Sequence, residues 1–502
     1  MLRNKGERVP TRCLLAACCV VWLAGCASQE GAIKTQSAPI NAAQMGTSTA
    51  LSGWTPSAAN WPTSQWWRRY ADPQLDRLVD VALRDSPSLH MAQARVRLAM
   101  ALSGVADAAR SVQISAGARE SRQRYSEDST FPAPLAGSWK SYDEVMLNAS
   151  YDFDFWGKNE AALQAALDRQ HAVEVELQAA RLLVSSSLVQ TYLRLAQLYL
   201  QLDLAQQTQA QRQDILRLTQ QRRAAGLDSD VELKLADGAV PAARQQVAAL
   251  QESISLTRQQ LGALMGAGPD GGLALERPSL PLDQLAGLPS SVPTELIGHR
   301  PDIVAQRWRV EAAGREIKVA HAQFYPNVSL VSYIGVQSIY LSHFFDIGSR
   351  VGSLGPAVSL PVFDGGRLRS NLGARNAEYD IAVEQYNLGV SNALQDVVGV
   401  LTSMQTVAAQ RNDQAQAVQS STIGYDLALQ RYQAGTGNYL QVLSAALQCQ
   451  GQQRLLVDLQ ARSLLLDASL QRALGSGVLD AQDALTMRHA PLIDAARPPL
   501  ID

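Results

Sequence analysis

The chain has 502 residues, which is longer than a typical single domain and predicts at least two domains. Charged residues make up 18% of the chain and the formal net charge is −2, so no basic surface for nucleic acid is expected. The mean hydropathy of −0.09 is too polar for a bundle of transmembrane helices. The six histidines show no ligand spacing and no Cys-x-x-Cys pair occurs, so neither a metal nor a cofactor is expected.

The first 25 residues have the pattern of a signal peptide. Four positive residues precede an apolar run, 13–24, that is too short to cross a membrane as a helix. The run ends in Leu23-Ala24-Gly25-Cys26, which resembles the lipobox of bacterial lipoproteins, where the chain is cleaved before a lipid-carrying cysteine. We therefore expect lipidation at Cys26, with Ala27 favouring the outer membrane; an ordinary signal peptide with a chance cysteine is the alternative.

Two further segments are predicted to lie outside the folded part of the chain. Residues 26–53 are rich in Ala, Ser, Thr and Gln, which predicts a lipidated flexible tether. Residues 478–502 end with several prolines and predict an unstructured C-terminal tail. After cleavage only Cys26 and Cys449 remain, and a lipidated Cys26 leaves no partner for a disulfide, so Cys449 is expected to be buried.

The chain contains an internal repeat. An offset of 209 residues places Arg222-x-x-Ala225-Gly226 on Arg431-x-x-Ala434-Gly435, and earlier in each half the offset becomes 214, which places Arg95-Val96 on Arg309-Val310. Such a sustained offset indicates a duplicated unit. We predict a first repeat at 54–268 and a second at 269–477.

Each repeat has two segments in which apolar and polar residues alternate, which is the pattern of a strand with one apolar face. Their length, about ten residues, is also that of a strand that crosses a membrane. A soluble sandwich is the alternative, but four isolated strands make a poor sandwich. The predicted strands are 112–119, 145–155, 328–337 and 353–362. In the second strand the expected lipid-facing residues are Val145, Leu147, Ala149 and Tyr151, and the expected lumen-facing residues are Asn148, Ser150 and Asp152.

The longest segments are helical. Neither 158–223 nor 367–433 contains a proline, and apolar residues recur at steps of three and four. Each segment would be about 100 Å long as a helix. Gly226 and Gly435 then stop the helices, and a return helix follows each one. We predict long helical hairpins at 158–265 and 367–474.

Four strands cannot close a barrel by themselves. An open sheet edge in lipid would leave backbone N–H and C=O groups without partners, and the smallest membrane barrels have about eight strands. One chain must therefore share its barrel with copies of itself, while the long helices form a tube below it. The repeat does not determine the number of copies.

A set of motifs occurs in one order over about residues 54–476. They are Trp66-Trp67-x-x-Tyr70-x-Asp72-Pro73, Ser150-Tyr151-x-x-Asp154-x-Trp156-Gly157, His299-Arg300-Pro301-Asp302, Phe324-Tyr325-Pro326, Asp364-Gly365-Gly366-Arg367 and Arg431-Tyr432-x-x-Gly435. Together they resemble the outer-membrane efflux proteins of the TolC and OprM type, in the lipoprotein subgroup often called NodT-like.

This resemblance implies an α+β membrane protein in which the duplicated unit contributes four strands to a shared, trimeric, 12-stranded β-barrel above a long α-helical coiled-coil barrel. It implies a homotrimer anchored in outer-membrane lipid, extending into the periplasm, and docked to a periplasmic adaptor (membrane fusion) protein and an inner-membrane efflux pump. The implied function is a passive exit duct for small molecules and drugs. No cofactor and no enzymatic activity are expected.

The resemblance also implies a periplasmic gate near the two turn glycines, Gly226 and Gly435. By motif, Asp230 and Tyr432 occupy positions that resemble a latch pair between neighbouring helix pairs. A plain helix N-cap is the alternative role for Asp230. The family often has charged residues where this chain has Gly437, Gln441 and Ser444, so an acidic ring is missing here.

A structural coiled-coil lipoprotein without channel activity is the main alternative function. It is disfavoured by the four amphipathic strands, which a structural rod does not need. A secreted enzyme is disfavoured because no nucleophile elbow, phosphate-binding loop or dinucleotide-binding motif occurs in a strand–helix context.

Overall fold

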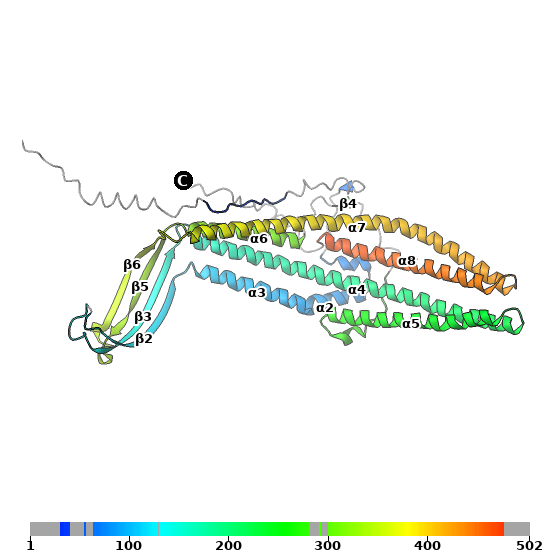
Figure 1. The fold of residues 1–502 in the computed structure, drawn as a ribbon, viewed down its shortest axis with the longest axis horizontal. Coiled ribbons are helices and arrows are strands. Elements are labelled where there is room, and N and C mark those ends of the chain that lie inside the picture. Colours follow the sequence, from blue (N-terminus) through cyan, green and yellow to red (C-terminus); the bar gives the residue numbers. More distant parts are fainter. Residues whose placement is uncertain are drawn as a thin grey trace, which may run out of the picture.

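A computed structural model describes residues 31–40, 55–56, 64–128, 130–280, 291–292 and 300–475. Within them, a long bundle of helices carries a four-stranded antiparallel sheet at one end (Figure 1). The signal peptide 1–25, Cys26 and the tail 478–502 lie outside the described residues. No described helix has both the length and the apolar character that crossing a membrane requires.

The elements follow one another twice in the same order. The helices are α2 (Pro73–Asp85), α3 (Pro87–Ala108), α4 (Lys158–Ala224), α5 (Asp230–Leu264), α6 (Pro301–Ala322), α7 (Arg367–Gln433) and α8 (Tyr439–Ala473). The sheet consists of β2 (Gln113–Arg124), β3 (Trp139–Phe153), β5 (Asn327–Ser338) and β6 (Arg350–Ser359). Short 3-10 helices are η2 (Trp66–Tyr70), η3 (Pro269–Gly272), η5 (Leu341–His343) and η6 (Ile347–Ser349), and the two-residue strands β1 (Thr55–Pro56) and β4 (Ser291–Val292) pair in parallel.

The two halves of the chain have helices of equal length. Both α3 and α6 have 22 residues, α4 and α7 have 67, and α5 and α8 have 35. The first residues of α4 and α7 are 209 positions apart, and those of α3 and α6 are 214 apart. These are the two offsets found in the sequence, so the duplicated unit is confirmed.

The sheet has the strand order β2-β3-β5-β6, and its register places like residues side by side. Leu147 pairs with Ala116 and Ile334, whereas Asn148 pairs with Ser115 and Tyr333. Most apolar residues of the four strands therefore share one face, as the alternation predicts, although Met146, Val331 and Val351 lie on the other. Leu147, Ile334 and Leu354 are exposed on the shared face, so no other part of the described chain covers it.

The strands differ from their predicted bounds at both ends of the sheet. The first strand was expected to end at residue 119, but β2 continues to Arg124. The second was expected to begin at residue 145, but β3 begins at Trp139. The acidic pair Glu120 and Asp143 stands on the face of Ala118 and Val145 and interrupts the apolar alternation, but backbone pairing continues through it. The last strand, expected at 353–362, ends at Ser359, two residues before Pro361, which has no N–H for a further ladder bond.

The largest core lies where the two halves of the chain meet in the middle of the helical bundle. Trp66, Trp67 and Tyr70 of η2 are buried with residues of α2, α4, α5 and α8. The Tyr70 hydroxyl donates a hydrogen bond to Asp467 of α8 at 2.8 Å, and Arg69 pairs with the same carboxylate at 3.1 Å. The aromatic motif near the N-terminus thus joins the first hairpin to the second.

Residues 31–40 form an extended segment that lies along α7 (Figure 1). The backbone N–H groups of Gln36 and Ser37 donate to Asp380 at 3.0 and 3.1 Å, and Ile40 donates to Asn387 at 2.8 Å. Asn387 in turn donates to the carbonyl of Ala38 at 3.2 Å. The sequence-based expectation of a flexible tether over 26–53 is therefore wrong for residues 31–40, because side chains of α7 satisfy their backbone groups.

Candidate functional site at the hairpin tips

Each long hairpin reverses direction at a glycine. Gly226 and Gly435 have φ values of +75° and +77°, in the left-handed region that a side chain disfavours. The N–H of Leu227 donates to the carbonyl of Arg222, and the N–H of Thr436 donates to that of Arg431, both at 2.9 Å. These bonds satisfy carbonyls at the helix ends, so the chain turns within a few residues.

The first tip then starts its return helix with a complete cap. Ser229 is the N-cap residue: its hydroxyl accepts from the N–H of Val231 at 3.2 Å. Glu232 accepts from the N–H of Ser229 at 2.9 Å, which makes this a capping box. At the second tip, Asn438 caps α8 by accepting from the N–H of Gln441 at 2.9 Å.

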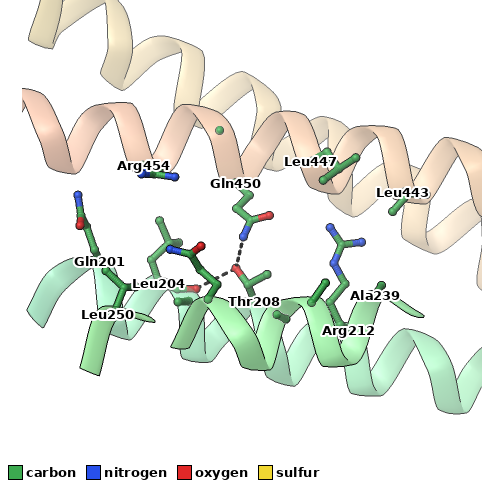
Figure 2. A pocket seen from close by; sticks show the side chains of 15 residues that line it. Gln201, Leu204, Thr208, Arg212, Ala239, Leu250, Leu443, Leu447, Gln450 and Arg454 are labelled. Atoms are coloured by element: carbon green, nitrogen blue, oxygen red, sulfur yellow. Dashed lines mark hydrogen bonds between the residues drawn. The ribbon is translucent and has the colours of Figure 1, made fainter. Parts of the chain in front are cut away.

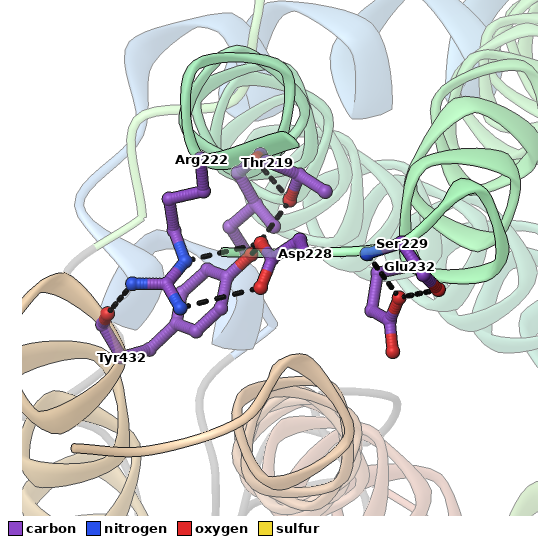
Figure 3. A network of polar contacts seen from close by, with 7 residues as sticks. Thr219, Arg222, Asp228, Ser229, Glu232 and Tyr432 are labelled. Atoms are coloured by element: carbon purple, nitrogen blue, oxygen red, sulfur yellow. Dashed lines mark hydrogen bonds and ion pairs between the residues drawn. The ribbon is translucent and has the colours of Figure 1, made fainter. Parts of the chain in front are cut away.

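A network of polar contacts connects the two tips of one chain (Figure 3). The Tyr432 hydroxyl, on α7, donates a hydrogen bond to Asp228 in the turn between α4 and α5. Arg222 of α4 pairs with Asp228 through two nitrogens, at 3.0 and 3.2 Å, and donates to the Tyr432 carbonyl at 2.8 Å. Its guanidinium also lies 4.3 Å from the Tyr432 ring centroid, and Thr219 lies 3.1 Å from the hydroxyl.

The network is buried although it lies at the end of the bundle. The side chains of Arg222 and Asp228 are 10% and 6% exposed, and Tyr432 is 0% exposed. Burial, and then the hydrogen bond to Asp228, raises the pKa of Tyr432 to about 12, so the phenol stays a neutral donor near pH 7. The hydrogen bond to Asp228 also raises the pKa of Arg222. A buried, paired carboxylate with several donors is costly to disrupt.

The expected partner of Tyr432 in this region was Asp230, and within the chain that expectation is wrong. Asp230 is the first residue of α5; its side chain is 73% exposed and pairs with Arg223 at 2.7 Å. It is not the N-cap either, because Ser229 takes that position. Asp228 precedes the cap and faces the second tip (Figure 3), whereas Asp230, at the start of α5, is exposed.

The second tip has no counterpart of Asp228. The 209-residue offset places Gly437 there, and a Cβ on Gly437 would lie 3.1 Å from both the Cβ of Arg431 and the N of Tyr432. A side chain at this position would therefore crowd the turn that places Tyr432. Within its described residues, each chain therefore has a single tip-to-tip network of this kind.

No group of three or more His, Cys, Asp or Glu side chains in the described ranges is placed to hold a metal ion. Cys449 is buried in a core near the tips that both hairpins share, with Tyr425 and Val442 of the second hairpin and Ile215 of the first. Sequence reasoning identified Tyr432 and the turn glycines but missed Arg222 and Asp228, although Arg222 belongs to the repeated Arg-x-x-Ala-Gly motif.

Comparison with known proteins shows the family to which this chain belongs. The sequence model of the family described as "Outer membrane efflux protein" matches residues 78–267 and 292–476, one segment for each half of the chain. The chain belongs to the outer membrane efflux protein family.

Relatives of this efflux protein have names that agree with the family. The fusaric acid resistance protein FusA of Burkholderia cepacia is 39% identical over 71% of this chain and 67% of its own. The multidrug resistance outer membrane protein MdtP of Escherichia coli O157:H7 is 32% identical over 84% of this chain and 88% of its own. The crystal structure of the outer membrane protein VceC from Vibrio cholerae is 40% identical, with a TM-score of 0.78 over 84% of this chain and 100% of its own. These findings confirm the family and fold class expected from the sequence and locate the protein in the outer membrane.

Proposed function

We propose that this efflux protein is the outer-membrane channel component of a tripartite efflux pump, a passive exit duct for small molecules and not an enzyme. One observation carries the proposal: a single sheet with one continuous, uncovered apolar face continues into two helical hairpins of about 100 Å. An apolar face of that kind suits lipid, and hairpins of that length reach well beyond a bilayer.

The sheet edges support a shared barrel. β2 and β6 are the outer strands, and each has one edge without a partner in the described chain. Backbone groups on such an edge must be paired in lipid, so β6 of one copy would pair with β2 of the next. Three copies would close a 12-stranded barrel, as the family resemblance implies, and two copies would reach only the smallest known barrel size.

The hairpins would then form a tunnel into the periplasm, with the Asp228–Tyr432–Arg222 network near its end. A gate at the tips fits a duct that opens only when a periplasmic adaptor and an inner-membrane pump dock to it. Relatives are named for fusaric acid resistance, multidrug resistance and pyoverdine export, so small organic molecules are the proposed cargo. Selection among them would belong to the pump.

A structural coiled-coil lipoprotein is the competing function, and a gel and a bilayer experiment separate the two. The purified protein should migrate faster on a denaturing gel before heating than after, since transmembrane barrels resist the detergent. In planar bilayers it should form discrete conductance steps. A protein that shows neither behaviour and unfolds as a helical rod would overturn the channel proposal.

The anchor at Cys26 is part of the same proposal. Residue 31 lies five positions after Cys26, a distance of at most about 18 Å for an extended chain. Gly31 lies beside Arg369, at the end of α7 that adjoins the sheet, and Asn376 donates to the carbonyl of Ile33 at 2.5 Å. The docking of residues 31–40 on α7 thus supports the proposal that a lipid on Cys26 would lie close to the barrel.

Replacing the thiol tests the anchor. We expect Cys26→Ser to abolish incorporation of labelled palmitate and cleavage before residue 26, because only a thiol accepts the lipid. Barrel insertion should persist, since the apolar strand faces are unchanged. Labelled palmitate in the Cys26→Ser protein would contradict the assignment of this residue.

A further inference from the structure

An open cavity of about 440 Å³ separates the two hairpins some distance above their tips. Its walls come from α4, α5 and α8, so both halves of the chain contribute (Figure 2). It is distinct from the tip network, because neither Tyr432 nor Asp228 lines it. A ligand held here would touch both hairpins at once.

Arg212 gives the cavity a buried positive charge. The residue is only 6% exposed, and its Nη1 atom has no hydrogen-bond partner in the described chain. Figure 2 shows the side chain extending from α4 toward α8, between Leu443 and Leu447. A buried guanidinium without an anionic partner is strongly disfavoured, so this position favours an anion.

The charged residues of the lining also favour an anion over a cation. No Asp or Glu lines the cavity, whereas Arg454 of α8 does and forms no ion pair with any described residue. Gln450 donates to Thr208 at 3.0 Å, which joins α8 to α4 beside Arg212. Two cations and no carboxylate on one lining make it complementary to a negatively charged group.

Apart from Gln201 and Gln246, the rest of the lining is apolar. Leu204 and Leu250 lie on it together with several alanines of α4 and α5. Leu250 is 8% exposed and Leu447 is 56% exposed, so the apolar lining has one side sheltered from solvent and one side open to it. A volume of about 440 Å³ is far larger than one inorganic ion and falls within the range of small-molecule pockets.

We propose that this cavity binds a small monocarboxylate with an apolar body. The carboxylate accepts hydrogen bonds from Arg212, with Arg454 adding attraction, and the apolar body packs on Leu204 and Leu250. Planar guanidinium groups bind carboxylates through paired hydrogen bonds, which gives the site its selectivity. Because the walls belong to both hairpins, the bound acid holds α8 against α4 and α5.

Binding of 4-bromobenzoate to the full-length protein in detergent tests the proposal. Titration calorimetry at constant ionic strength should give one site per chain, and anomalous diffraction from bromine should place the ligand beside Arg212. We expect Arg212→Gln to weaken binding about tenfold or more, because it removes a charge-assisted hydrogen bond. Arg217→Gln is the matched control: Arg217 is also on α4, but it is exposed and pairs with Asp214.

A second variant removes space and keeps the charge. Gly451 lines the cavity, and a Cβ built on it meets nothing within 4 Å, so Gly451→Met fills the cavity without a backbone clash. We expect it to weaken binding as much as Arg212→Gln does, which keeps the test decisive if the arginine variant fails to fold.

Three results would overturn the proposal. Equal binding of the neutral 4-bromobenzamide would show partition into apolar surface or detergent. Displacement of the acid by chloride at equal concentration would show a site for inorganic anions only. Unchanged affinity in the Gly451→Met protein would place the ligand elsewhere.

Discussion

Channels that carry Asp228→Ala together with Tyr432→Phe should be open for a much larger fraction of the time, and so carry several-fold more mean current in planar bilayers, than the unaltered protein. The double variant removes the carboxylate that joins Arg222 to Tyr432 and the hydroxyl that donates to it. Both groups are buried, so their contacts are not replaced at full strength by water. The two hairpin tips of each chain should then separate more readily.

The size of the effect follows from the number of copies. A charge-assisted hydrogen bond contributes about 2 kcal/mol. If three chains contribute independently, the loss is about 6 kcal/mol, which is enough to move a two-state equilibrium from roughly 1:99 to 99:1. Cells that produce the variant should also become sensitive to large antibiotics that the closed channel excludes.

Asp230→Ala is the matched control for this experiment. Asp230 lies two residues from Asp228, but its side chain is 73% exposed and its ion pair with Arg223 is at the surface. Surface pairs of this kind contribute little, so its conductance should match the unaltered protein. If Asp230→Ala opened the channel as far as the double variant does, with assemblies intact on a gel, the tip network would not be the latch.

The second large effect concerns the two faces of the sheet. We expect Leu147→Arg to reduce assembly of the barrel severely, whereas Asn148→Arg should assemble nearly normally. Leu147 lies between Ala116 and Ile334 on the apolar face, and Asn148 lies between Ser115 and Tyr333 on the opposite face. An arginine that faces lipid near the middle of the bilayer costs about 2–4 kcal/mol per chain.

The fraction of heat-modifiable protein in outer-membrane preparations measures this difference. The two positions are adjacent in one strand, so backbone propensity and local pairing are matched and only the direction of the side chain differs. Equal assembly of the two variants would mean that the apolar face does not contact lipid. Failure of Asn148→Arg alone would reverse the assignment of lipid and lumen.

Much of the architecture was predictable from local patterns in the chain. The offsets of 209 and 214 residues anticipated helices of equal length, because a duplicated sequence repeats its helix starts and stops. Alternation around Leu147 predicted the apolar face of the sheet, since a strand directs successive side chains to opposite faces. Gly226 and Gly435 predicted the reversals, because each must adopt a left-handed conformation that other residues resist.

The tertiary structure decided which side chains meet between segments that are distant in sequence. Asp228 and Tyr432 are 204 residues apart, and although the capping box at Ser229 separates Asp228 from Asp230 locally, nothing in the sequence shows that Tyr432 lies opposite Asp228. Residues 31–40 have a composition typical of a tether, yet they pair with α7 because Asp380 and Asn387 lie at the right positions along that helix. The buried charge of Arg212 likewise appears only once α8 packs beside α4. Periodicity and turn chemistry act over a few residues and are written in the chain, whereas contacts between hairpins depend on how whole helices pack, and only the folded molecule determines that.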